Sequence, residues 1–231
     1  MLNISLPAAQ GPFSVAVLLR RMNFEKKGCK MRKLTLDEII KLRRSVRMYE
    51  GKKVDKEILK VIIEACRFAP SACNAQPWRF IVVSDKEKVK MIFEKTLGGV
   101  VLNDWAKTAP VYIVACAKKS FLVHKVGAGL KNIPYHFLDM GAAIEHILLK
   151  TTELGLGSCW IGWFNKKAIR NILHIPRNID VVSLITIGYE SQKFEPGQRE
   201  RLSLEEILFL NKYGEPFSPK NYETEIRTSK K

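Results

Sequence analysis

The apolar positions along this chain follow helical spacing in some segments and form short continuous runs in others, which predicts a mixture of helices and strands. Apolar residues from Ile58 to Ala69 fall on one helical face, and Asp55 before them is a residue type that caps helices. The unbroken apolar runs Phe80–Val83 and Val111–Ala117 predict buried strands. Because helices and strands mix without a strict strand–helix–strand rhythm, we predict an α+β sandwich in which helices cover a central sheet.

Residue types that begin and end helices mark the other elements. A Ser or Thr followed three residues later by Glu forms a capping box, and such boxes open predicted helices at Thr35, through about Leu42, and at Ser203, to about Leu210. The longest predicted helix is Tyr135–Leu154, which Gly155 closes in the C-cap role. The remaining predicted elements are a helix after Asp85, a helix at Lys166–His174 and a strand at Val181–Ile187.

The length of 231 residues is enough for one large domain with a substantial core. The predicted pattern begins just after Met31, so we interpret residues 1–30 as an N-terminal extension and residues 31–231 as the domain. The apolar stretch Phe13–Leu19 is followed by arginines rather than preceded by them, which is not the order of a secretory signal. Met22 and Met31 are later candidate starts, and a short added helix is the alternative interpretation. No apolar run approaches the length needed to cross a bilayer.

The formal net charge of +16 attracts polyanions, so nucleic acid is a rival partner. The basic residues are nevertheless spread along the chain and mixed with acidic ones, and no DNA-binding fingerprint is present, so we do not favour this reading. The five cysteines are scattered and form no C-x-x-C pair, which argues against a disulfide framework and a zinc site. This cysteine usage predicts a reducing, cytoplasmic location.

The segment Arg43-Arg44-Ser45-Val46-Arg47 carries three guanidinium groups and a hydroxyl within five residues. Guanidinium groups grip a phosphate through paired hydrogen bonds. Arg43 and Arg47 are four residues apart, so on a continuing helical turn they would share one face. Taken alone, the cluster is better explained as basic residues that complement the dipole at a helix C-terminus.

Two further segments strengthen the phosphate interpretation. The first, Pro70-Ser71-Ala72-Cys73-Asn74-Ala75-Gln76-Pro77-Trp78, is rich in small residues and lets the backbone approach a flat ligand, although an ordinary helix-to-strand connection has the same composition. The second, Gly155-Leu156-Gly157-Ser158-Cys159-Trp160-Ile161-Gly162, follows a helix rather than preceding one, so its glycines do not form a dinucleotide loop. An aromatic core strand is the plain alternative for this last segment.

In this order and spacing, the three segments resemble the FMN-dependent nitroreductase family, and the resemblance covers about Leu34 to Tyr213. It implies a nitroreductase-like sandwich whose central, mostly antiparallel sheet is covered by helices, with a C-terminal arm such as Asn211–Ile226 exchanged in a homodimer. It also implies an FMN cofactor, NAD(P)H as electron donor, and a small-molecule acceptor such as a nitroaromatic or a quinone, reduced by a ping-pong mechanism.

The resemblance also transfers roles to individual residues. Arg47 matches the basic residue near N1 and O2 of the flavin, and the Gly162 N–H matches the group that approaches N5 or O4. The Pro70–Trp78 loop would reach the flavin of the neighbouring subunit, and Arg199 and Arg201 would close over the phosphate. The complete predicted FMN-binding set is Arg43, Arg44, Ser45, Arg47, Pro70, Ser71, Ala72, Asn74, Trp160, Ile161, Gly162, Arg199 and Arg201.

We expect no catalytic side chain and no metal, because in this chemistry the cofactor carries the reaction. His136 and Asp139 stand three apart without a third ligand, so a surface or interface hydrogen bond is the preferred reading. Cys73 and Cys159 have no partnered base that would mark a nucleophile. Candidates to line the acceptor pocket are Phe121, Tyr135, Trp160 and Trp163.

Two other functions stay open at this point. One is a specialised relative, dehalogenase-like or flavin-consuming, which would need an active-site lid, and Ser120–Pro134 is the candidate lid. The other is a basic, nucleic-acid-associated protein without redox activity.

Overall fold

The computed structural model describes residues 34–97, 103–118, 134–191 and 199–217. The chain forms two compact units, Met1–Phe194 and Glu195–Lys231. The predicted extension at residues 1–30 lies outside the described residues, as does the candidate lid except for Pro134.

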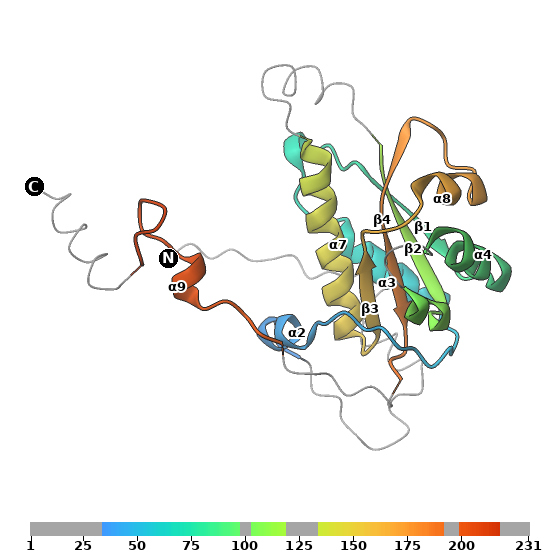
Figure 1. Ribbon diagram of the computed structural model, residues 1–231, viewed down its shortest axis with the longest axis horizontal. Helices are drawn as coiled ribbons and strands as arrows, with labels where there is room; N and C mark the ends of the chain where they lie inside the picture. Colours follow the sequence, from blue (N-terminus) through green and yellow to red (C-terminus); the bar gives the residue numbers. More distant parts are fainter. Residues whose placement is uncertain (1–33, 98–102, 119–133, 192–198, 218–231) are drawn as a thin grey trace, which may run out of the picture. The chain divides into compact units, whose positions relative to one another are not determined.

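A four-stranded sheet forms the centre of the first unit (Figure 1). Its strand order is β1-β2-β4-β3, and the three strand pairs are all antiparallel. This arrangement confirms the predicted α+β class with an antiparallel sheet, while the exchanged C-terminal arm stays a prediction. The strands are β1 (Trp78–Val83), β2 (Val111–Lys118), β3 (Gly157–Ile161) and β4 (Ile179–Gly188).

Helices cover both faces of this sheet (Figure 1). One layer contains α3 (Lys56–Cys66) and α7 (Tyr135–Glu153), and the other contains α4 (Lys86–Thr96), η3 (Asp104–Thr108) and α8 (Lys166–Ile172). Within the described part of the chain, every helix is too short or too polar to span a bilayer.

The central strand β2 shows why its sequence has no polar alternation. Successive side chains of a strand point to opposite faces, so Ile113 and Ala115 join the core beneath α3 and α7. Tyr112 and Val114 join the core beneath α4 and α8. Both faces are covered, and the strand is buried from Val111 to Ala117, as predicted.

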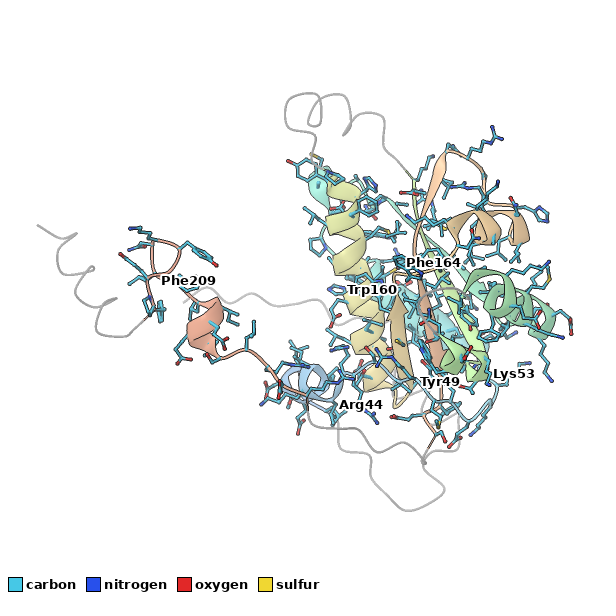
Figure 2. The ribbon with its side chains drawn as sticks, viewed as in Figure 1. Arg44, Tyr49, Lys53, Trp160, Phe164 and Phe209 are labelled. Atoms are coloured by element: carbon cyan, nitrogen blue, oxygen red, sulfur yellow. The ribbon has the colours of Figure 1, made fainter. Side chains whose placement is uncertain are left out.

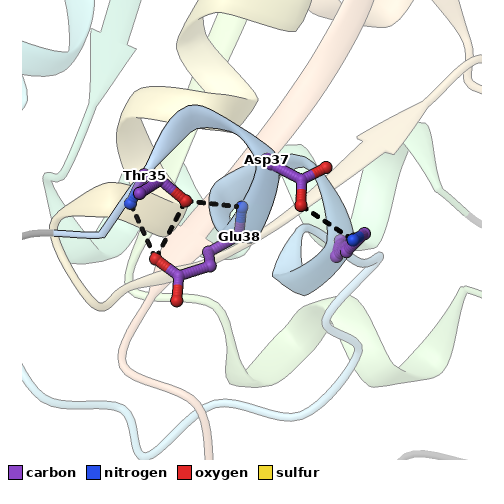
Figure 3. Close-up of polar contacts among 4 residues, drawn as sticks. Thr35, Asp37 and Glu38 are labelled. Atoms are coloured by element: carbon purple, nitrogen blue, oxygen red, sulfur yellow. Dashed lines mark hydrogen bonds and ion pairs between the residues drawn. The ribbon is translucent and has the colours of Figure 1, made fainter.

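Local capping fixes the start of α2 (Leu36–Leu42), as predicted (Figure 3). The Thr35 hydroxyl accepts a hydrogen bond from the Glu38 N–H at 3.3 Å, and the Glu38 carboxylate accepts one from the Thr35 N–H at 2.8 Å. One turn on, Lys41 pairs with Asp37 at 2.7 Å. The side chains of Asp55 and Asp85 cap α3 and α4 by accepting hydrogen bonds from the Glu57 and Lys88 N–H groups, which confirms both predictions.

The end of α7 confirms the C-cap assigned to Gly155. This glycine has a φ of +71°, the left-handed conformation in which a side chain is disfavoured. Its N–H donates to the Thr152 carbonyl, and the Leu156 N–H donates to the Thr151 carbonyl, both at 3.0 Å. These two bonds form a Schellman motif, so the chain turns directly from α7 into β3.

Several predicted boundaries differ from the structure, among them those of β4, which spans Ile179–Gly188 rather than Val181–Ile187. Phe80–Val83 was expected to be a buried strand, but β1 begins at Trp78 and forms an edge of the sheet, where Val82 is 40% exposed. The short helix α8 ends at Ile172 rather than at His174, whose φ is +51°. The helix after Ser203, α9 (Leu204–Ile207), ends before Leu210 because Leu208 adopts an extended conformation.

The second unit has its own local structure. In it, Glu206 accepts a hydrogen bond from the Ser203 N–H at 2.8 Å, as the capping box requires. Beyond α9, Phe209 and Pro216 form an antiparallel bridge, and the Phe209 and Tyr213 rings pack with centroids 4.8 Å apart. The unit is therefore a short helix followed by a tight hairpin.

The backbone after α2 is fastened across one end of the sheet, where two glycines face each other in register. Ser45 and Ser158 form a parallel bridge, and the Val46 N–H donates to the Ser158 carbonyl at 2.8 Å. A Cβ added at Gly157 would lie 2.7 Å from the Val46 side chain, and one added at Gly188 would lie 2.8 Å from the Tyr49 ring. Glycine at these two positions is what lets the segment lie this close to the sheet.

We predict that Gly188→Ala destabilises the protein by about 1–3 kcal/mol, because the added methyl group overpacks a closed contact with Pro110 and Tyr49. The matched control is Gly141→Ala on α7, where an added Cβ meets nothing within 4 Å. Alanine forms helices better than glycine, so this change should not destabilise the protein. Denaturant unfolding, fitted with one m-value for all variants, measures the free energy of unfolding of both. A Gly188→Ala protein as stable as the wild type would contradict this packing.

Candidate active site

The arginine segment leaves α2 at once instead of continuing it. Arg43 is the C-cap of α2, with φ −56° and ψ 126°, and the chain then enters the bridge at Ser45. The prediction that Arg43 and Arg47 share a helical face is therefore wrong. Instead, Arg43 faces Glu145 on α7, whereas Arg47 faces Trp105 on η3, in the other helical layer. The bridge to Ser158 is a long-range contact that local sequence does not encode.

Each of the three arginines is held by a different element. The Arg43 Nε lies 3.7 Å from the Glu145 carboxylate on α7. The Arg44 Nη2 lies 2.5 Å from the Glu190 carboxylate just after β4, and Figure 2 shows Arg44 and Tyr49 at this end of the sheet. The exposed Arg47 places its guanidinium 6.0 Å from the centre of the Trp105 ring on η3.

The bridge at Ser45 brings the first and third predicted segments together. Strand β3 begins at Gly157 beside the arginine segment and carries Trp160 further along (Figure 2). The Trp160 side chain is 42% exposed, and a Cβ added at Gly162 would meet nothing within 4 Å. The same strand therefore starts beside the arginine segment and ends in an open, partly aromatic surface.

The second segment is held by a buried carboxylate. Its centre is η2 (Ala72–Asn74), where Cys73 and Asn74 have φ values of 50° and 51°, a strained conformation for residues with side chains. The Ala72 N–H donates to the Asp139 carboxylate of α7 at 2.9 Å. Glu145, the partner of Arg43, lies about 9 Å further along the helix axis. The first and second segments thus contact the same helix at different levels (Figure 1).

The reading of His136 and Asp139 as a surface or interface pair is wrong for Asp139, which is buried and bonds to the Ala72 loop. The His136 Nε2 instead lies 4.0 Å from the Asp180 carboxylate of β4. Although His136 and Asp139 are three residues apart on α7, each contacts a different neighbouring element. The described residues contain no cluster of three His, Cys, Asp or Glu side chains that could hold a metal.

One buried polar group near Arg47 has no signal in the sequence. Asn103 is 8% exposed, and its Nδ2 has no hydrogen-bond partner among the described residues. It immediately precedes η3, which carries Trp105 beneath the Arg47 guanidinium. An unpaired buried amide is costly, so this donor is a candidate ligand-binding group that sequence reasoning missed.

Other predicted residues lie in the second unit, outside the described residues, or on α7 and after β3. Arg199 and Arg201 are exposed and belong to the second unit. Phe121 lies outside the described residues, Tyr135 is half-buried at the start of α7, and Trp163 is 60% exposed after β3. The assignment of all these residues to a cofactor or an acceptor stays a prediction.

The chain belongs to the nitroreductase family. The family model, described as "Nitroreductase family", matches residues 40–103 and 94–189. Those ranges contain the arginine segment, the Pro70–Trp78 loop and the end of β3.

Similar proteins agree with membership of this family. A protein of Archaeoglobus fulgidus, provisionally named an NADH dehydrogenase/NAD(P)H nitroreductase, is 37% identical over 163 residues, which cover 67% of this chain and 86% of the relative. The FMN reductase [NAD(P)H] of Bacillus subtilis is 30% identical over 193 residues, 77% of this chain and 75% of the relative. The structure of an FMN-dependent nitroreductase from Clostridium difficile R20291 superimposes with a TM-score of 0.61 at 32% identity, covering 76% of this chain and 98% of that one.

The thiols of the first unit differ sharply in accessibility. Burial raises the pKa of the Cys66 and Cys116 thiols to about 11, and Cys159 is buried in β3, whereas Cys73 is exposed on the η2 loop. With such a pKa, roughly one thiol in a thousand is ionised at pH 8, and the thiolate is the reactive form.

In FMN-free protein with a Cys29→Ser background, we predict that Ellman's reagent at pH 8 rapidly modifies one thiol per chain, that of Cys73. The three buried thiols of Cys66, Cys116 and Cys159 should react only after unfolding in guanidinium. The Cys73→Ser variant is the control and should lose the fast phase. Rapid reaction of a second thiol in the folded protein would show that the core is more open than described.

Proposed function

We propose that this protein is an FMN-dependent NAD(P)H oxidoreductase that reduces small acceptors such as nitroaromatics or quinones. One observation carries the proposal: the Ser45–Ser158 bridge sets the arginine segment beside the start of β3, the strand that carries the exposed Trp160. A phosphate clamp next to an exposed aromatic strand end suits a ligand with an anionic tail and a flat ring. The names of the similar proteins, which include FMN reductase and NAD(P)H nitroreductase, support this choice of ligand.

The described residues fit the chemical groups of FMN. Arg43 and Ser45, at the bridge to β3, would hold the phosphate and a ribityl hydroxyl. The open space at Gly162 leaves room for a ring to approach the backbone, and its N–H would donate to the ring. The buried Asn103 amide supplies a further donor that has no partner among the described residues.

When bound, FMN supplies a two-electron carrier that takes a hydride from NAD(P)H and passes the electrons to the acceptor. The chain contributes positioning and charge. Arg47 would stabilise the negative charge of the reduced ring, held in place by its contact with Trp105. The partly exposed Trp160 would border the surface that donor and acceptor occupy in turn, which gives ping-pong kinetics.

We infer that the active form is a homodimer. Exposed apolar side chains lie along α2 and at the start of α7, including Leu36, Ile40 and Leu138, and the second unit exposes Leu204 and Tyr213. Exposed apolar side chains that gather on one element mark a candidate interaction site. A second copy of the chain would cover it and bring in Ser71–Asn74 and Arg199 beside the cofactor. The free cysteines support a reducing, cytoplasmic setting.

The direct test of this function is uptake of FMN. We predict that the purified or reconstituted protein is yellow and oxidises NAD(P)H when a quinone or nitroaromatic is added. Arg43→Ala should raise the Kd for FMN roughly 10- to 100-fold, because a charge-assisted hydrogen bond to phosphate is lost. The control is Arg67→Ala, which removes the same charge from an exposed pair with Glu64. A purified protein that is colourless and does not bind added FMN would refute the proposal.

A second prediction concerns the reduction potential. Arg47→Ala should make the midpoint potential of bound FMN more negative by about 30 mV, equivalent to about 1.4 kcal/mol for a two-electron couple. The sign follows because the guanidinium stabilises the negative, reduced ring more than the neutral, oxidised one. Titration against a reference dye under anaerobic conditions measures the shift, with Arg67→Ala again as control. An unchanged potential would remove Arg47 from this role.

A further inference from the structure

Glu190 contacts the arginine segment twice, through its side chain to Arg44 and through its backbone to Tyr49. The charged groups of Arg44 and Glu190 approach to 2.5 Å, with side chains only 22% and 26% exposed. The backbone of Glu190 is itself bridged to Tyr49. Next to this bridge, the Ser191 N–H donates to the Met48 carbonyl and the Glu50 N–H to the Tyr189 carbonyl, each at 3.0 Å. The side chain of Arg44 is therefore tied to the residue that already holds the far end of its own segment.

Arg44 differs from Arg43 and Arg47 in its partner. Its carboxylate partner Glu190 lies just after β4, whereas Arg43 faces α7 and Arg47 faces η3. The Arg43 ion pair is longer, at 3.7 Å, and its partner Glu145 is 45% exposed, so a phosphate can replace that carboxylate at little cost. The Arg44 contact is shorter and more enclosed, so replacing Glu190 would strand a partly buried carboxylate.

We propose that Arg44 is a positioning residue rather than a phosphate ligand, and that Glu190 is its partner in this role. The pair fixes the backbone that carries Arg43, Ser45 and Arg47 before any ligand arrives. A site that is already ordered loses less conformational freedom on binding, so the pair strengthens FMN binding without touching FMN. This inference rests on the function proposed above.

The test compares Glu190→Gln with the wild type by titrating apoprotein with FMN and following the quenching of flavin fluorescence. Removing a negative charge near an anionic ligand should tighten binding if electrostatics alone act. Positioning predicts the opposite sign: a Kd raised roughly tenfold, measured well below the melting temperature of each apoprotein. The control Glu50→Gln makes the same charge change on an exposed carboxylate at the end of the segment and should not weaken binding.

A double-mutant cycle then assigns the effect to the pair. Arg44→Gln should weaken binding as much as Glu190→Gln, and the double variant should be no worse than either single one. Unchanged or tighter binding by Glu190→Gln, or additive effects in the cycle, would overturn the positioning role and favour direct contact of Arg44 with phosphate.

Two further results also decide the question. If Glu190→Gln does not fold, the exchanged variant Arg44→Glu with Glu190→Arg must bind FMN within about threefold of the wild type, and weaker binding overturns the proposal. If the wild type itself takes up no FMN, the proposed function fails and this inference fails with it. Wild-type binding combined with an unaffected Glu190→Gln refutes the positioning role alone.

Discussion

The structure depends on one close approach, that of the Val46–Tyr49 backbone to the glycine pair at the start of β3 and the end of β4. With a Cβ at either glycine, the segment would be pushed off the sheet. Its closeness is reinforced by the Tyr49 hydroxyl, which donates to the Val46 carbonyl at 2.8 Å and lies 2.7 Å from the Thr186 hydroxyl. Burial raises the pKa of this phenol far above its ordinary value, so Tyr49 stays neutral and keeps these contacts. This packing holds the backbone that follows Arg43 and Arg44 and carries Arg47.

Helix α7 is the second organising element, because it serves both the core and the site. Its apolar face packs against α3 and the sheet, and its side chains Met140, Ala143, Ile144 and Ile147 are fully buried. Two carboxylates on the same helix hold functional segments: Asp139 binds the Ala72 N–H and Glu145 pairs with Arg43. A rigid, deeply packed helix is well suited to this task, since its side chains keep their spacing whether or not a ligand is bound.

Features encoded within a few residues could be predicted from the sequence, and features set by distant contacts could not. The capping boxes, the Asp55 and Asp85 caps, Gly155 and the enclosed strand β2 all follow from local residue types. The edge position of β1 depends on which strands pair with it. The extended path after Arg43 depends on Ser158, more than a hundred residues away, and the partners of Arg44 and Asp139 are equally remote. The three site segments themselves were found by resemblance to a family and not by periodicity.

The central claim is that the bridged arginine segment and the open end of β3 together hold FMN between two copies of the chain. A crystal structure of the protein grown with FMN tests this most directly. The account predicts a dimer with the phosphate within hydrogen-bond distance of Arg43 and the flavin ring against the Gly162 backbone. A monomer without flavin, or FMN bound away from both Arg43 and Gly162, would contradict it.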